Sequence, residues 1–166
     1  MGKSEPLDIL LTHDAHATGL VIDACRGLSG DDFHRPLGMG VGSLHDTILH
    51  ILGAMRGWTD LLAGRDEPRP RLEAEGKKTC DELRVLLGEA AAELRAEAER
   101  LPMDDVARGS RGGRDYAFTR GGIFTHVTTH GMHHRAQCVH MLKRLGVEPL
   151  PEVSVVRWMI EHNPVD

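Results

Sequence analysis

Four long segments of the chain carry apolar residues at the spacing of three and four that is typical of amphipathic helices. No segment of useful length alternates between apolar and polar residues as a half-buried strand does. The expected helices cover residues 6–28, 44–63, 80–101 and 120–145, and a shorter helix is expected over residues 152–162. The pattern therefore predicts an all-α protein.

Residues suited to helix ends support these boundaries. Ser43, Thr79 and Thr119 each precede an expected helix and offer a hydroxyl that can accept a hydrogen bond from the first free backbone N–H groups. Pro102 marks the end of the third long helix, and Gly146 is the expected C-cap residue of the fourth.

The segments between the helices are long. Residues 33–42 are rich in Gly and Pro, residues 65–71 form a solvated connector, and residues 103–118 are expected to be an irregular loop. Connections of this length favour a four-helix bundle with crossover loops and a short extra C-terminal helix. The length of 166 residues predicts a single domain over residues 1–166.

Composition narrows the range of partners. The formal net charge of -5 and the absence of a basic tail or stripe argue against nucleic acid as a partner. The longest apolar stretches are far short of the roughly 20 residues that cross a bilayer, and the opening residues lack an apolar signal region. We expect a cytoplasmic protein with no membrane contact. The three cysteines, Cys25, Cys80 and Cys138, form no C-x-x-C pair, so no disulfide framework is predicted.

Histidine is the unusual feature of the composition, with 11 residues, several of them in the fourth long helix. On a helical wheel, His134 lies within the apolar stripe of this helix and His130 lies on its flank, one turn earlier. The i, i+4 spacing lets two imidazoles on one face converge on one metal ion. His126 lies further round the wheel and is a neighbour of the pair.

A third ligand is expected from another helix, because catalytic zinc sites use three protein ligands and leave a position for water. His50 flanks the apolar stripe of the second long helix and is the better candidate there, although a lone interior histidine is also common as a hydrogen-bonded core residue. On the first helix, Asp14 lies where its carboxylate could accept the second ring N–H of a ligand histidine. Cys138 is an alternative thiolate ligand or a small buried hydrophobe.

The remaining candidates have simpler interpretations. Five other histidines are expected to be solvated surface residues: His16, His34, His45, His140 and His162. Four arginines in or next to the irregular loop are candidates to bind an anionic substrate, or else belong to a mobile surface loop. They are Arg108, Arg111, Arg114 and Arg120.

Two stretches around these histidines resemble the DinB-like family, which includes thiol-dependent transferases related to YfiT. SerLeuHisAspThrIleLeuHisIleLeu (43–52) is similar to the family's second-helix segment, whose closing histidine is a ligand. HisValThrThrHisGlyMetHisHisArgAlaGln (126–137) resembles its fourth-helix signature, H-x-x-x-H followed by Arg, a small residue and Gln. The likeness covers most of the chain.

The resemblance implies His50, His130 and His134 as the three ligands of one divalent metal ion, with water in the open positions. It also implies an up-down-down-up helix arrangement and a homodimer. It does not imply a particular reaction, because many members of the family have no assigned substrate.

Three hypotheses for function follow. The first is an enzyme in which the metal activates water or a low-molecular-weight thiol for hydrolysis or S-transfer to a small electrophile. The second is a non-catalytic, stress-related protein that sequesters the metal or is held together by it, and the third is a plain helical scaffold. Zinc is the default metal for histidine ligands, while nickel, iron and copper also suit imidazole.

Overall fold

The computed structural model describes residues 5–111 and 113–162 of the chain. Within these ranges the protein is mostly helical with one small sheet, and its elements in chain order are α1 (Pro6–Ala24), α2 (Gly30–His34), α3 (Leu44–Leu62), the 3-10 helix η1 (Leu72–Glu75), α4 (Cys80–Arg100), β1 (Val106–Arg111), β2 (Arg114–Thr119), α5 (Arg120–Arg144) and α6 (Val155–His162). The predicted extent of one domain also includes residues 1–4, 112 and 163–166, which lie outside the described part, and it stays a prediction.

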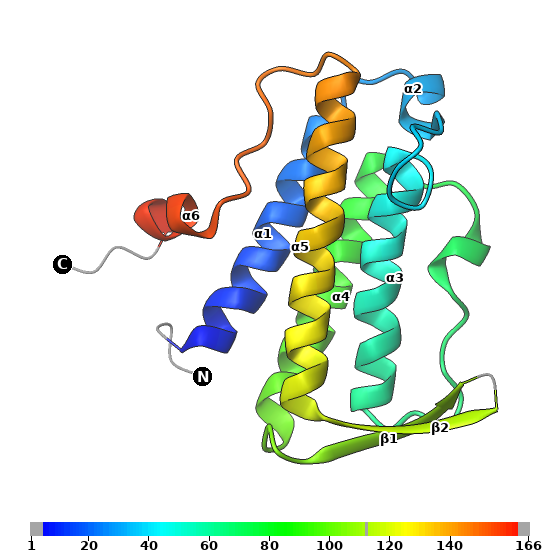
Figure 1. Ribbon diagram of the computed structural model, residues 1–166, viewed down its shortest axis with the longest axis vertical. Coiled ribbons are helices and arrows are strands. Elements are labelled where there is room, and N and C mark those ends of the chain that lie inside the picture. Colours follow the sequence, from blue (N-terminus) through cyan, green and yellow to red (C-terminus); the bar gives the residue numbers. More distant parts are fainter. Residues whose placement is uncertain (1–4, 112, 163–166) are drawn as a thin grey trace.

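The four long helices lie side by side (Figure 1). Helix α3 contacts α4 and α5, and α1 contacts the same two helices from the other side. In Figure 1, α1 and α5 run upward while α3 and α4 run downward, so the segment between α3 and α4 returns along the outside of the molecule. Within the described ranges, every helix is too short or too polar to cross a bilayer.

The predicted N-caps are confirmed. Ser43 accepts a hydrogen bond from the N–H of Asp46, and Thr119 accepts one from the N–H of Gly122. Thr79 forms a reciprocal capping box with Glu82, in which each side chain bonds to the other residue's backbone N–H. These polar contacts satisfy backbone groups that would otherwise lack partners, which is why each helix begins where it does.

The first helix is shorter than predicted. It ends at Ala24, and the following residues close tighter turns in which the N–H of Arg26 donates to the carbonyl of Asp23 and the N–H of Leu28 to that of Cys25. A short helix that the sequence pattern did not predict follows α1. Ser29 accepts a hydrogen bond from the N–H of Asp32 and thereby caps the short helix α2.

The core lies between the four long helices and is built from their apolar stripes. Its largest fully buried apolar side chains are Ile22, Leu44, Ile48, Ile51, Leu52, Leu72, Leu83, Leu94, Ile123, Phe124 and Met141. One of them, Leu72, belongs to η1, so the segment that returns along the outside is fixed to the core at this point. Helix α6 packs Trp158 against His13 of α1, with ring centroids 6.0 Å apart.

The prediction of a helical protein is confirmed for most of the described residues, but two strands take the place of most of the irregular loop expected at residues 103–118. Strands β1 and β2 form an antiparallel hairpin whose pairing runs from Val106 opposite Thr119 to Arg111 opposite Arg114. Most described side chains of the hairpin are exposed, and Phe118 is 44% exposed. One face of the hairpin is only partly covered, where Ala107 packs against the core and Phe118 contacts Trp58, so its sequence carries only a weak alternation of apolar and polar residues.

Candidate metal centre

Helices α3 and α5 bring three histidines together. His50 comes from α3, and His130 and His134 lie one turn apart on α5, which packs against α3. One ring nitrogen from each histidine lies within 4.8 Å of the other two, and the Nε2 atoms of His50 and His130 are 3.2 Å apart. The three residues that the sequence singled out as ligands therefore meet at one place.

The donor set fits a divalent metal ion. Imidazole nitrogens bind zinc at about 2.0–2.1 Å, so two nitrogens on one tetrahedral ion lie roughly 3.3 Å apart. The observed distance of 3.2 Å between the His50 and His130 nitrogens is close to this value. Imidazole also suits nickel, iron and copper, so the donor atoms do not select one metal.

Two of the histidines are oriented by hydrogen bonds at Nδ1. His134 Nδ1 lies 2.8 Å from Gln137 Oε1, and His50 Nδ1 lies 3.2 Å from Glu73 Oε1. Both partners offer an oxygen acceptor, so each Nδ1 carries the proton and donates it. This tautomer leaves the lone pair on Nε2 free to bind a metal.

The surroundings of His130 and His134 keep these two imidazoles neutral. Burial, together with the positive charge that His134 and His50 would carry, lowers the pKa of His130 to about 4. Burial also lowers the pKa of His134, although the hydrogen bond to Gln137 opposes this shift. At neutral pH these two rings therefore hold lone pairs rather than charges, as metal ligands must.

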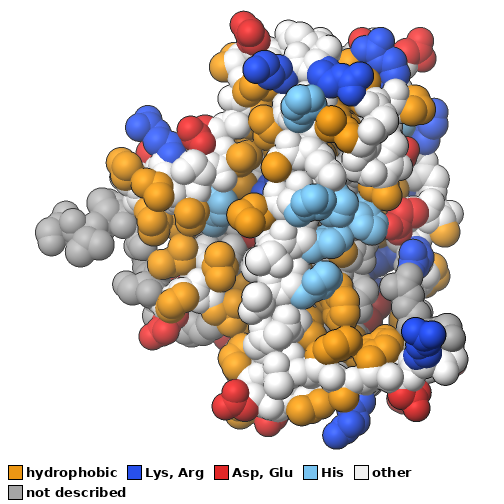
Figure 2. All heavy atoms as spheres, viewed as in Figure 1, with side chains coloured by type: hydrophobic (Ala, Val, Ile, Leu, Met, Phe, Trp, Pro, Cys, Tyr) orange, Lys and Arg blue, Asp and Glu red, His pale blue; other side chains and the backbone are white. Residues whose placement is uncertain are grey.

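The triad is open to solvent. The His50 side chain is 31% exposed, and Figure 2 shows histidine side chains gathered in the middle of the face formed by α3 and α5. The exposure of His50 lets a small molecule approach the site. A separate groove of about 370 Å³ borders His50 on the side of Glu73 and Lys77, and neither His130 nor His134 lines it.

Asp14 is not placed as predicted. Its carboxylate pairs with Arg135 of α5 through Oδ1, and Thr18 also accepts a hydrogen bond from this arginine. Both members of the pair are buried, and Asp14 Oδ2 has no hydrogen-bond partner. Asp14 therefore links α1 to α5, and the carboxylate that contacts a histidine of the triad belongs to Glu73.

Arg120 is also not placed as a substrate contact. Its side chain is only 2% exposed, and it donates hydrogen bonds to the backbone carbonyls of Leu62 and Glu97. The guanidinium therefore joins the ends of α3 and α4 to the start of α5. Arg108 and Arg114 lie on the hairpin, at the end of the molecule, and the side chain of Arg111 lies outside the described part.

The other predicted neighbours differ in placement. His126 is exposed, with its ring centroid 5.5 Å from that of His130 and 5.0 Å from that of Trp58. His45, expected at the surface, is buried. Its ring forms a hydrogen bond with the Asp46 carboxylate and accepts another from the backbone N–H of Lys78. Cys138 is fully buried, which raises the pKa of its thiol to about 12, and it is not part of the group of converging donor atoms.

Sequence reasoning missed Glu73 and Gln137 as partners of the triad. Gln137 lies within the signature-like stretch, three residues after His134, so its spacing on one helix face was a usable signal. Glu73 had no such signal. It reaches His50 from 23 residues further along the chain, through the fold of the connection between α3 and α4.

Comparisons with known proteins agree with this architecture. A crystal structure of the DinB-like protein YjoA from Bacillus subtilis, at 2.30 Å resolution, matches with a TM-score of 0.62 and 17% identity, over 87% of this chain and 96% of that one. At this identity the likeness shows the fold alone. No curated protein matches the sequence. The model of the DinB family matches residues 2–159, so the chain belongs to the DinB family.

Proposed function

We propose that the protein is a metal-dependent enzyme with a three-histidine site for one divalent ion, most simply zinc. The observation that carries the proposal is the convergence of ring nitrogens from His50, His130 and His134 within 4.8 Å on an accessible face. The scaffold in this proposal is an up-down-down-up four-helix bundle with crossover loops. We also propose that the protein is cytoplasmic and forms a homodimer. Light scattering of the purified protein tests the dimer.

The chain's own residues would hold the metal and leave its open side free for a reactant. A divalent ion bound by three neutral imidazoles keeps its full charge and lowers the pKa of a coordinated water or thiol toward neutrality. Glu73 and Gln137 hold the protons of His50 and His134 on Nδ1. The exposed side of the triad would receive a small electrophile, so the proposed reaction is hydrolysis of this electrophile or S-transfer to it from a low-molecular-weight thiol.

A non-catalytic role is the second candidate. The triad joins α3 to α5, so a bound metal would also hold these two helices together. The exposure of His50 favours catalysis, because a purely structural zinc site is normally closed by four protein ligands.

Elemental analysis of protein purified without a histidine tag tests the metal site. We expect about one equivalent of a divalent metal in the wild type and strong loss in His50→Ala, His130→Ala and His134→Ala variants. The matched control is His140→Ala, an exposed histidine on the same helix. Equal metal content in the His130→Ala and His140→Ala variants would support the plain helical scaffold.

A reaction screen tests the enzymatic role. The metal-loaded protein is assayed for thiol conjugation and for hydrolysis across a broad panel of small electrophiles. Turnover that disappears with the triad variants supports the proposal. Full metal loading without turnover on the panel, together with unfolding when the metal is stripped, would favour the non-catalytic role.

A further inference from the structure

We infer that Glu73 is a positioning residue for His50. We also infer that Gly53, which has no side chain, leaves room for the Glu73 carboxylate. This inference rests on the proposed function, because it assigns a role within the same metal site. It makes the connection between α3 and α4 part of the site, although this segment supplies none of the three ligands.

The contact geometry places Glu73 behind His50. Glu73 Oε1 lies 3.2 Å from Nδ1 of His50, whereas Nε2 of the same ring lies 3.2 Å from His130 Nε2. The two nitrogens of an imidazole point away from each other, so the carboxylate and the metal position lie on different sides of the ring. Glu73 therefore acts on the metal through His50, by fixing the tautomer and the direction of the ring.

Gly53 allows the close approach. It lies three residues after His50 on α3, and a Cβ atom added to it would meet Glu73 Oε2 at 3.1 Å and Oε1 at 3.3 Å. Any other residue would therefore crowd the carboxylate. Gly57, about one turn further along the same helix, has no atom within 4 Å of its added Cβ position. The crowding is specific to the position that faces Glu73.

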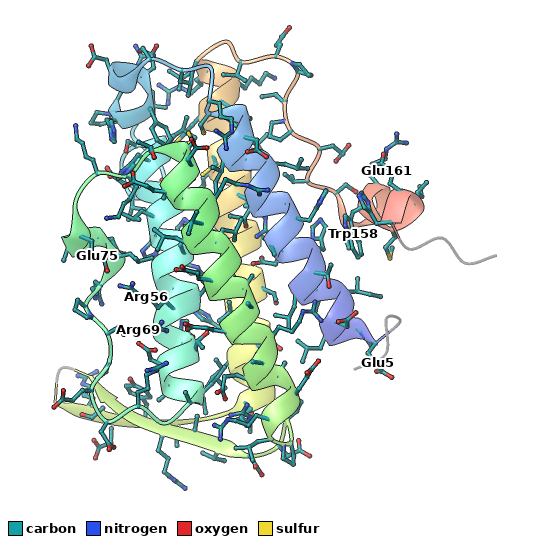
Figure 3. The ribbon with its side chains drawn as sticks, turned by 180° about the vertical axis from the view of Figure 1, so that it is seen from behind. Glu5, Arg56, Arg69, Glu75, Trp158 and Glu161 are labelled. Carbon is teal, nitrogen blue, oxygen red and sulfur yellow. The ribbon has the colours of Figure 1, made fainter. Side chains whose placement is uncertain are left out.

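The segment that carries Glu73 is anchored on both sides. Leu72 is 1% exposed in the core, and Glu75 pairs with Arg56 of α3 at 2.7 Å. Further back along the connection, Arg69 contacts Asp60 of α3 and Glu93 of α4, each at 2.7 Å. Figure 3 shows Arg56, Arg69 and Glu75 along this side of α3. These contacts fix the backbone from which Glu73 reaches His50.

Two pairs of variants test the inference. Glu73→Ala removes the carboxylate, and its control Glu67→Ala removes an exposed carboxylate of the same connection between α3 and α4. Gly53→Ala crowds Glu73, and its control Gly57→Ala makes the same change in open space. Zinc affinity is measured by competition with a chromophoric chelator. We expect a loss of about 10- to 100-fold in Glu73→Ala and a smaller loss in Gly53→Ala.

The tautomer of His50 gives a second readout that a merely structural role would not move. Nitrogen NMR of the metal-free protein should show the proton of His50 on Nδ1 in the wild type and in both controls. We expect a shift of this proton toward Nε2 in Glu73→Ala, with the far-ultraviolet circular dichroism unchanged.

The outcomes separate this inference from the proposed function. A wild type that binds zinc, with zinc affinities of Glu73→Ala and Glu67→Ala that are equal and an unchanged His50 tautomer, would overturn the role of Glu73 alone. A wild type that binds no divalent metal would overturn the proposed function. An altered tautomer in the metal-free Glu73→Ala protein would then still show that Glu73 orients His50.

Discussion

The buried pair of Asp14 and Arg135 is a charged contact between α1 and α5. Burial raises the pKa of Asp14, and the guanidinium of Arg135 opposes that shift. Arg135 follows His134 directly, so the pair also fixes the turn of α5 that carries two of the proposed ligands. A residue predicted as an outer partner of a ligand thus acts on the helix that holds the ligands.

Removal of the Asp14 carboxylate should be costly. Asp14→Ala leaves the Arg135 guanidinium buried without its anion, and breaking such a pair costs about 3–5 kcal/mol. Urea unfolding of the metal-free protein measures this change. Asp23→Ala is the control, because Asp23 forms only exposed ion pairs, whose loss costs about 1 kcal/mol or less. Equal losses in the two variants would contradict the role assigned to Asp14.

The pKa of His130 predicts how stability depends on pH. The unfolded chain takes up a proton near pH 6.5, whereas the folded chain holds His130 neutral down to about pH 4. Between these values the unfolded state binds more protons, so acid favours unfolding. We expect the metal-free protein to lose stability as the pH falls from about 6.5 to 4, and His130→Gln to show a shallower loss. Parallel curves for the two proteins would contradict this pKa.

At the scale of elements, capping residues could be predicted from the sequence and the exposed hairpin could not. A cap depends on a few neighbouring residues, such as Thr79 and Glu82, whose contact is complete within one helical turn. The hairpin instead depends on pairing between two strands whose side chains mostly face solvent. The sequence therefore shows no clear alternation of apolar and polar residues in these strands.

A glycine in α5 makes a prediction about helix packing. A Cβ added to Gly131 would meet Asp14 Oδ1 at 2.5 Å and Arg135 at 2.8 Å. Gly131→Ala should therefore destabilise the protein, although alanine favours helix. Gly88→Ala in α4, where the added atom meets nothing within 4 Å, should instead stabilise it by roughly 0.5–1 kcal/mol. Thermal unfolding of both variants checks the opposite signs, and a stabilised Gly131→Ala would contradict the packing described.

The capping box of α4 makes a second prediction at this scale. Thr79→Ala removes the hydroxyl that accepts the N–H of Glu82, and the loss of such a cap costs about 0.5–2 kcal/mol. Urea unfolding measures the loss. Thr129→Ala, an exposed position on α5 whose hydroxyl bonds only to its own helix, serves as the control and should change stability less.

For the molecule as a whole, the metal is expected to join α3 to α5. Binding to the folded state alone stabilises it by about 2.7 kcal/mol at 100 times the dissociation constant. For a chain of this length, that corresponds to a rise in Tm of roughly 5–10 °C. Thermal unfolding with and without zinc should show the rise in the wild type and in His140→Ala, but not in His134→Ala. An equal rise in all three proteins would place zinc elsewhere.

The sequence by itself determined the long helices, their caps and the two histidines of α5. These features depend on contacts within one helix. Because an α-helix has a fixed number of residues per turn, the separation of two residues in the sequence determines the directions of their side chains. His50 was a candidate from its stripe, and resemblance to the family strengthened it. The tertiary structure alone decided that Glu73 contacts His50, that Asp14 and Arg120 join helices, and that residues 106–111 pair with residues 114–119. Each of these features depends on segments that meet only after the chain has folded. The spacing of residues within one segment does not predict such contacts.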